Sequence, residues 1–266
     1  MTRALGVLDL LRVAPFYAAG AAVACGLKLF YSRAGAEDLD WVLAPTSRLV
    51  ELISDARFEK ERHVGWISHT HGIIVGPSCA GINFLIIALA TFFFTLIHRF
   101  RRAAHRCAWL GLSLALAYAL TLAANALRIA ATIQLYRMDI YGEVITVERV
   151  HRAEGTVIYC LSLLLAYLTV ERALAWWQGD RGSRSLGSAL APLAWYLAIG
   201  VGLPLANRAY SDDAGRFLEH SGMVILICLV LATAGAGIAI ATRRMTGGRT
   251  GRADPAGPGG ARAPGC

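Results

Sequence analysis

Six long runs of apolar residues constrain this chain more than any other feature of its sequence. Each run is roughly 17–22 residues long, about the length that a helix needs to cross the hydrocarbon core of a bilayer. Backbone groups in lipid must be hydrogen bonded within the protein, and the runs are continuous rather than alternating, so helices are favoured over a β-barrel. The sequence therefore predicts an all-α, polytopic membrane bundle of about six transmembrane helices. The predicted spans are 13–31, 82–98, 108–130, 156–172, 189–206 and 222–242.

Composition and charge placement agree with a membrane protein. Only 17% of the residues are charged, against about 25% in soluble domains. If the N-terminus is cytoplasmic, 14 of the 26 basic residues fall in cytoplasmic segments and 10 in outer ones. Cytoplasmic loops are enriched in Lys and Arg, and the short link 99–107 is the clearest example. We therefore expect both termini to be cytoplasmic, and we attribute the net charge of +8 to anionic lipid of the bilayer rather than to nucleic acid.

The link 32–81 is the only large segment predicted outside the membrane. Residues 41–53 have the pattern of an amphipathic helix lying on the membrane interface, with Trp41 as an anchor. Residues 58–75 favour a short hairpin. The first apolar run lacks a clear cleavage site, so we expect an uncleaved first span. The chain thus divides into a transmembrane domain, 1–242, and a Gly- and Pro-rich cytoplasmic tail, 243–266, which we expect to be disordered.

Cys79 is the only one of the six cysteines predicted at the outer surface. It therefore has no outer disulfide partner, and the cysteine spacing fits no zinc pattern. A cysteine in an apolar setting is more often an inert small hydrophobic residue than a nucleophile. The preceding Gly-Pro-Ser turn, however, puts Cys79 just before a helix, around its N-cap or first turn. Free N–H groups and the helix dipole favour a thiolate there.

Arg128 lies at the end of the third apolar run, with Asn125 three residues earlier on the same helix face. A charge in such a run costs at least roughly 2–3 kcal/mol on insertion scales, which makes it a candidate functional residue. Snorkelling of the side chain to the outer interface is the alternative. Two polar groups on one face favour a polar pocket.

His151 occupies the outer link before the fourth span, followed by Arg152 and Glu154. Glu154 either orients the imidazole or favours the helix N-terminus by its charge. Short links join spans two to four, so Cys79, Arg128 and His151 are expected to meet at one membrane depth. In that arrangement His151 deprotonates the thiol and Arg128 stabilises an oxyanion. Four other histidines predicted on the outer side are rival bases: His63, His69, His71 and His220. His69 and His71 could also bind a metal, but no third ligand stands at a convincing spacing from them.

Three segments, 77–83 (Pro-Ser-Cys-Ala-Gly-Ile-Asn), 125–129 (Asn-Ala-Leu-Arg-Ile) and His151-x-x-x-Gly155, resemble in that order the motifs of the exosortase/archaeosortase family. The resemblance implies a membrane cysteine peptidase or transpeptidase without a cofactor, in which Cys79, Arg128 and His151 are catalytic. Supporting or substrate-binding roles are expected for Asn83, Asn125, Arg152 and Glu154.

The family's substrates are membrane-tethered exported proteins with a PEP-CTERM-like sorting signal, which is a short motif, an apolar helix and a basic cluster. The implied location is the bacterial cytoplasmic membrane, with the site on the extracytoplasmic side. This chain has Asn83 where many members have a basic residue, which leaves the substrate motif open.

Two other classes of function remain open. One is a non-catalytic polytopic subunit of an envelope-polymer export system, or a small transporter. Transporters often carry intramembrane acids, whereas Lys28 and Arg128 are the only charges that we place within spans. The other is a membrane acyltransferase that uses His151, in which Cys79→Ser would leave activity largely intact.

Overall fold

The computed structural model describes residues 7–138, 146–179, 186–207 and 214–247. Among these residues, five helices are long and apolar enough to cross a membrane. They are α1 (Val7–Tyr31), α3 (Ile82–Leu96) with the 3-10 turns on either side of it (together Pro77–Arg99), α4 (Ala103–Tyr136), α5 (Val147–Trp177) and α8 (Ala214–Gly247). The prediction of an all-helical membrane bundle is therefore confirmed. α8 extends five residues beyond the predicted end of the transmembrane domain, and the tail 248–266 lies outside the described residues.

The predicted span 189–206 corresponds to a shorter, irregular element. It consists of α6 (Leu186–Leu197), a π-helical turn (Ala198–Gly202) and α7 (Leu203–Ala206). Its apolar part, Leu190–Ala206, has 17 residues and would be about 26 Å long as a straight helix, slightly less than the bilayer core. Proline inside α6, Pro192, removes a helical hydrogen bond and is consistent with this irregularity.

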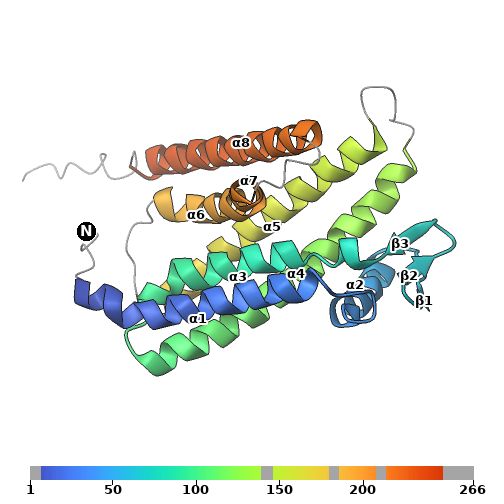
Figure 1. Cartoon of the computed structure of the whole chain (residues 1–266). Helices are drawn as coiled ribbons and strands as arrows, with labels where there is room; N and C mark the ends of the chain where they lie inside the picture. The colour runs from blue at the N-terminus through green and yellow to red at the C-terminus, as the bar shows by residue number, and fades with distance from the viewer. Residues whose placement is uncertain (1–6, 139–145, 180–185, 208–213, 248–266) are drawn as a thin grey trace, which may run out of the picture.

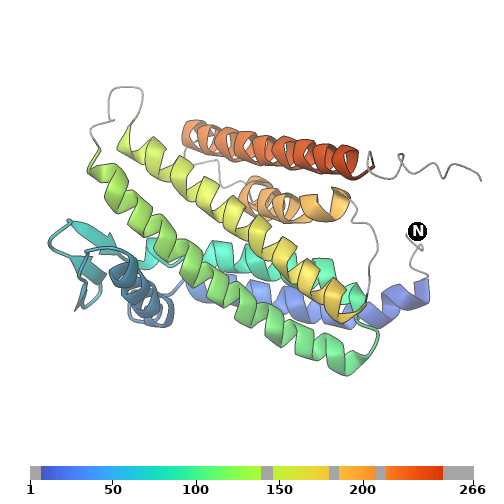
Figure 2. The ribbon, with the colours of Figure 1, turned by 180° about the vertical axis from the view of Figure 1, so that it is seen from behind.

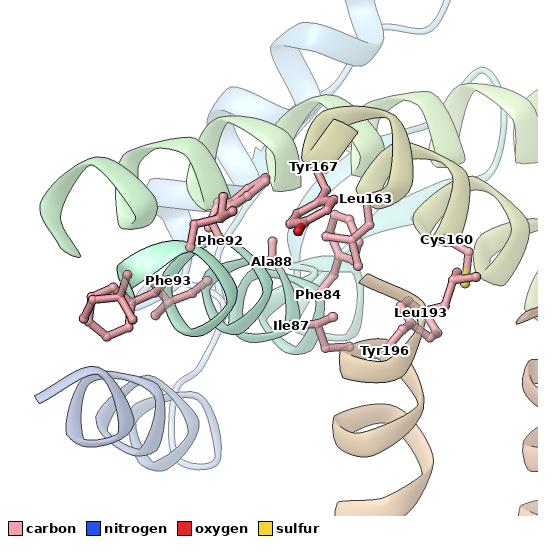
Figure 3. Packing of buried hydrophobic residues seen from close by; sticks show 14 of the residues in the cluster. Phe84, Ile87, Ala88, Phe92, Phe93, Cys160, Leu163, Tyr167, Leu193 and Tyr196 are labelled. Carbon is pink, nitrogen blue, oxygen red and sulfur yellow. The ribbon is translucent and has the colours of Figure 1, made fainter. Parts of the chain in front are cut away.

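Helix α3 lies at the centre of the bundle. In its most apolar window 78% of the residues are buried, against 11–28% in the other four long helices. It is apolar on every face, as expected of a helix surrounded by protein. Figure 1 shows α1, α4 and α6 around it, and Figure 2 shows α4 and α5 side by side on the opposite face. In Figure 3, Phe84, Ala88 and Phe92 of α3 face Leu163 and Tyr167 of α5.

A small module covers the end of the bundle at which α3 begins (Figure 1). It contains α2 (Asp40–Ile53) and the antiparallel strands β1 (Glu59–Glu61), β2 (Gly65–Ser68) and β3 (Ile73–Val75), in the order β1-β2-β3. The predicted hairpin is thus a three-stranded sheet. The start of α1 and the end of α8 both lie at the opposite end of the bundle (Figure 1).

The amphipathic helix predicted over 41–53 is confirmed as α2, but its apolar face packs against protein. Val42, Leu43 and Val50 are fully buried beneath the sheet and against α4. The Trp41 ring stacks on Tyr118 of α4 with 5.5 Å between centroids, and the Tyr118 hydroxyl donates to the Trp41 carbonyl at 2.7 Å. The tryptophan therefore fastens α2 to the bundle.

The expectation that no acidic residue lies within the spans is wrong. Helix α5 carries Glu171 with only 4% of its surface exposed. Its Oε1 atom lies 3.3 Å from Arg99, at the end of α3 distant from Cys79. A buried carboxylate requires such a partner, and the partner is 72 residues away in sequence.

Candidate active site

Cys79 lies in a short 3-10 turn, Pro77–Cys79, between β3 and α3. Its N–H donates to the Gly76 carbonyl at 2.8 Å, and its side chain is partly exposed. The sulfur lies 3.9 Å from the Ile74 carbonyl oxygen. Gly81, two residues later, is the N-cap of α3, so the thiol lies before the helix rather than at its N-cap or first turn.

Gly81 allows the turn to lie directly against α4. Its φ of +68° is in the left-handed region, which glycine adopts without strain. A Cβ atom there would also lie 3.2 Å from Thr121 and 3.6 Å from the Asn125 side chain. The Asn125 amide donates to the Cys79 carbonyl, and Tyr31 of α1 donates to the Pro77 carbonyl at 3.3 Å. Helices α1 and α4 thus hold the turn on both sides.

Asn125 connects the turn to the rest of the site. It is fully buried, and its Oδ1 atom accepts from Arg128 Nε at 3.2 Å and from the Tyr159 hydroxyl at 2.9 Å. The Tyr159 ring stacks on Phe84 of α3 with 4.4 Å between centroids. The polar network therefore rests on the apolar core around α3.

Arg128 is buried, with 8% of its surface exposed, so its side chain does not snorkel to the surface. Its guanidinium interacts electrostatically with the Cys79 thiol, and Nη1 lies 3.2 Å from His151 Nε2. Gly155 of α5 makes room for the side chain, since a Cβ there would lie 3.1 Å from Arg128 Cδ. The glycine of the His151-x-x-x-Gly155 segment is thus explained by contact with Arg128.

The second ring nitrogen of His151, Nδ1, is directed toward side chains of α4 and α5. His151 Nδ1 lies 3.2 Å from Thr132 Oγ1 and 3.7 Å from Glu154 Oε2, and Thr132 Oγ1 donates to Glu154 Oε2 at 2.9 Å. A guanidinium has only donors, so Nε2 accepts from Arg128 and Nδ1 carries the proton of the neutral ring. Thr132 and Glu154 are therefore placed to orient that N–H. Of the two roles considered for Glu154, the contact favours orientation of the imidazole.

Cys79, Arg128 and His151 come together as predicted, but Arg128 rather than His151 is the residue that interacts with both of the others. Arg128 hydrogen bonds to the imidazole and interacts electrostatically with the sulfur. The hydrogen-bond and ion-pair contacts of His151 in the described part of the chain are Arg128, Thr132 and Glu154. The expected direct hydrogen bond from thiol to imidazole is therefore not found among the described contacts, and Arg128 is the residue that interacts with both groups.

Two predicted supporting residues face elsewhere. Asn83 is exposed and accepts from Lys28 Nζ of α1 at 2.9 Å. Arg152 lies 3.6 Å from Glu219 of α8 and 3.9 Å from Glu148. Their contacts join helices and do not include Arg128 or His151. Sequence reasoning missed Thr132 and Tyr159, although each lies at helical spacing from a predicted residue on its own helix.

The rival histidines have other neighbours. His71 lies 2.7 Å from Arg137 and 3.4 Å from Asp55, and His63 lies 3.3 Å from Glu37, within or beside the small module of α2 and the sheet. Among the described residues, no three metal-binding side chains of the His, Cys, Asp or Glu type gather into one cluster.

Comparison of the chain with protein-family models, with curated proteins and with solved structures found no match.

Proposed function

We propose that this protein is a membrane cysteine peptidase or transpeptidase of the exosortase/archaeosortase type. It would cleave the C-terminal sorting signals of exported proteins at the extracytoplasmic face of the bacterial cytoplasmic membrane. The observation that carries the proposal is the meeting of Cys79, Arg128 and His151, from a turn and two helices, around one partly exposed thiol.

The contacts suggest how the first half-reaction proceeds. The carbonyl oxygen of the scissile peptide is a new acceptor for Arg128, whose guanidinium leaves Nε2 of His151 and turns to the oxygen. Nε2 is then free to take the thiol proton, and the sulfur of Cys79 attacks the carbonyl carbon. Arg128 stabilises the oxyanion. His151 returns the proton to the leaving amine as the C–N bond breaks, which leaves a thioester on Cys79.

The second half-reaction uses the same groups in reverse. An amine or water attacks the thioester and gives its proton to His151, and the C–S bond breaks to restore the thiol. Glu154 and Thr132 keep the Nδ1 proton in place and stabilise the imidazolium that forms in each half-reaction. No step requires a metal or a cofactor.

Strand β3 offers a way to align the substrate. It pairs with β2 on one edge and has no second partner among the described strands. The Ile74 carbonyl faces the Cys79 sulfur and so is directed away from β2. Residues of an antiparallel strand direct N–H and C=O to the same side, so Ile74 presents both groups on the outer edge. A peptide added to that edge would pass the thiol.

Substitution of Cys79 tests the proposal in the source cells. We expect Cys79→Ala to leave exported proteins with their C-terminal apolar tails, detected by mass spectrometry of C-terminal peptides from membranes. Cys25→Ala and Cys107→Ala are matched controls, because both cysteines are exposed and neither contacts the site. Unchanged tail processing in the Cys79→Ala strain would eliminate a cysteine peptidase, and unchanged activity of Cys79→Ser would favour an acyltransferase that uses His151.

A further inference from the structure

A cavity of about 500 Å³ opens between α4 and α5, far from Cys79. Its walls are apolar side chains of the first half of α4 and the last turns of α5. Phe100 and His105 close the end at which α3 joins α4. Cys79 precedes the other end of α3, which is 15 residues long and spans about 22 Å. The cavity is therefore separate from the candidate active site.

The cavity lies on the outer surface of the bundle. Leu112 and Trp177, both in its wall, have 51% and 66% of their surface exposed. In a membrane-spanning helix, exposed leucine faces acyl chains, whereas tryptophan gathers at the level of the lipid headgroups. Trp176, beside Trp177, is 85% exposed. The groove thus runs from acyl-chain depth to headgroup level.

Basic residues surround its headgroup end. Arg101, Arg102 and His105 are exposed in the link and first turn before the cavity wall, and Arg172 is exposed next to Ala173 of the wall. Among the described residues of this region, the acid Glu171 is paired with Arg99. The mouth of the groove is therefore positively charged.

We propose that this groove binds an anionic phospholipid, with one acyl chain between α4 and α5 and the phosphate against Arg101, Arg102 and His105. The charge at the mouth decides between occupants. A zwitterionic lipid gains little from these residues, whereas an anionic headgroup gains about 1 kcal/mol for each nearby Lys or Arg. A sorting-signal helix would bring its own basic cluster to the same level and be repelled. The inference does not depend on the proposed peptidase activity.

Lipid binding to the purified full-length protein tests the proposal. Native mass spectrometry would compare phosphatidylglycerol with phosphatidylcholine of the same acyl chains. We expect preferential binding of phosphatidylglycerol, reduced on the order of tenfold or more by Arg101→Ala with Arg102→Ala. The control pair Arg57→Ala with Arg62→Ala removes the same charge from the opposite end and should change nothing. Equal binding of both lipids, or equal losses from the two pairs, would overturn the proposal.

The second measurement is made first on unmodified protein, so its main result does not depend on how variants fold. Phosphatidylglycerol with a photoreactive diazirine near the end of one acyl chain would be crosslinked in nanodiscs, and the labelled peptides mapped. We expect labels concentrated at the acyl-chain end of the groove, in 112–116 and around Val170, competed by unlabelled phosphatidylglycerol but not by phosphatidylcholine. Uniform labelling of all lipid-facing helices would contradict a specific site. The variant Ala108→Trp, which fills the groove, should abolish the concentrated label.

Discussion

Substitution of Gly155 by alanine separates the stability of the bundle from the geometry of its site. A Cβ atom there would lie 3.1 Å from Arg128 Cδ, so the arginine must retreat by about 0.3 Å to reach ordinary contact at 3.4 Å. Arg128 is held at Nε by Asn125 and at Nη1 by His151, each at 3.2 Å, so any retreat stretches one of these bonds.

The two effects of the substitution have opposite signs. Alanine in a helix interior stabilises the folded protein by about 0.5–1 kcal/mol relative to glycine, so the melting temperature should stay the same or rise slightly. A hydrogen bond to a charged group contributes about 1.5–3 kcal/mol, and a loss of about 1.4 kcal/mol in the transition state lowers a rate tenfold. We therefore expect Gly155→Ala to slow tail processing about tenfold, while the gain in helix propensity offsets most of the stability lost with the stretched bond, so that the melting temperature changes little.

The assay pairs thermal unfolding in detergent with the rate of tail removal in membranes. Gly111→Ala in α4 is the matched control, because a Cβ there has no neighbour within 4 Å and brings the same gain in helix propensity. It should leave the processing rate unchanged. A Gly155→Ala protein that processes tails as fast as the Gly111→Ala protein would refute the idea that Arg128 position limits the reaction.

Three further predictions concern the supports of the site. Asn125→Ala removes the hydrogen-bond partner of Arg128 Nε, the Tyr159 hydroxyl and the Cys79 carbonyl, and should lower the free energy of unfolding by about 2–4 kcal/mol; a loss below 1 kcal/mol, about that of an exposed substitution, would contradict the network. Ile74→Pro deletes the edge N–H of β3 and should slow cleavage far more than Ile74→Ala, and equal rates would exclude strand addition. The Lys60 hydrogen bond and then the Trp66 bond hold the pKa of Asp40 below its ordinary value, so the protection factors of the β2 amides, which correct for the intrinsic slowing of exchange by acid, should fall as the pH falls below about 4; Asp40→Asn should remove that pH dependence.

The depth of the site could be predicted from the sequence because it follows from span boundaries and short links. A residue at the start of one span and a residue at the end of the preceding or following antiparallel span must lie at one level, which brings Cys79, Arg128 and His151 together. The buried state of Arg128 followed from the same logic, since Asn125 shares its helix face.

Which of these three side chains contacts which, within the plane of the membrane, could not be predicted. It depends on how each helix is rotated about its axis, and contacts far apart in sequence set that rotation. Gly155 against Arg128 and Phe84 against Tyr159 are two of them. The buried pair of Arg99 and Glu171 was missed for another reason. Glu171 stands one residue before the end of the predicted span 156–172, and hydropathy gives no sign that it is buried or of which residue pairs with it.

In the proposed mechanism, the position of Arg128 means that the thiol is activated only after a substrate has bound. In the structure its donors occupy the nitrogen of His151 that would take the thiol proton. A guanidinium cannot pass that proton on, because at neutral pH it has no acceptor. The base becomes available only when a stronger acceptor draws Arg128 away, and the carbonyl oxygen of a bound peptide is such an acceptor once negative charge begins to form on it. A partly exposed thiol thereby stays unactivated until a peptide lies across it, since the same movement that frees the base also stabilises the oxyanion.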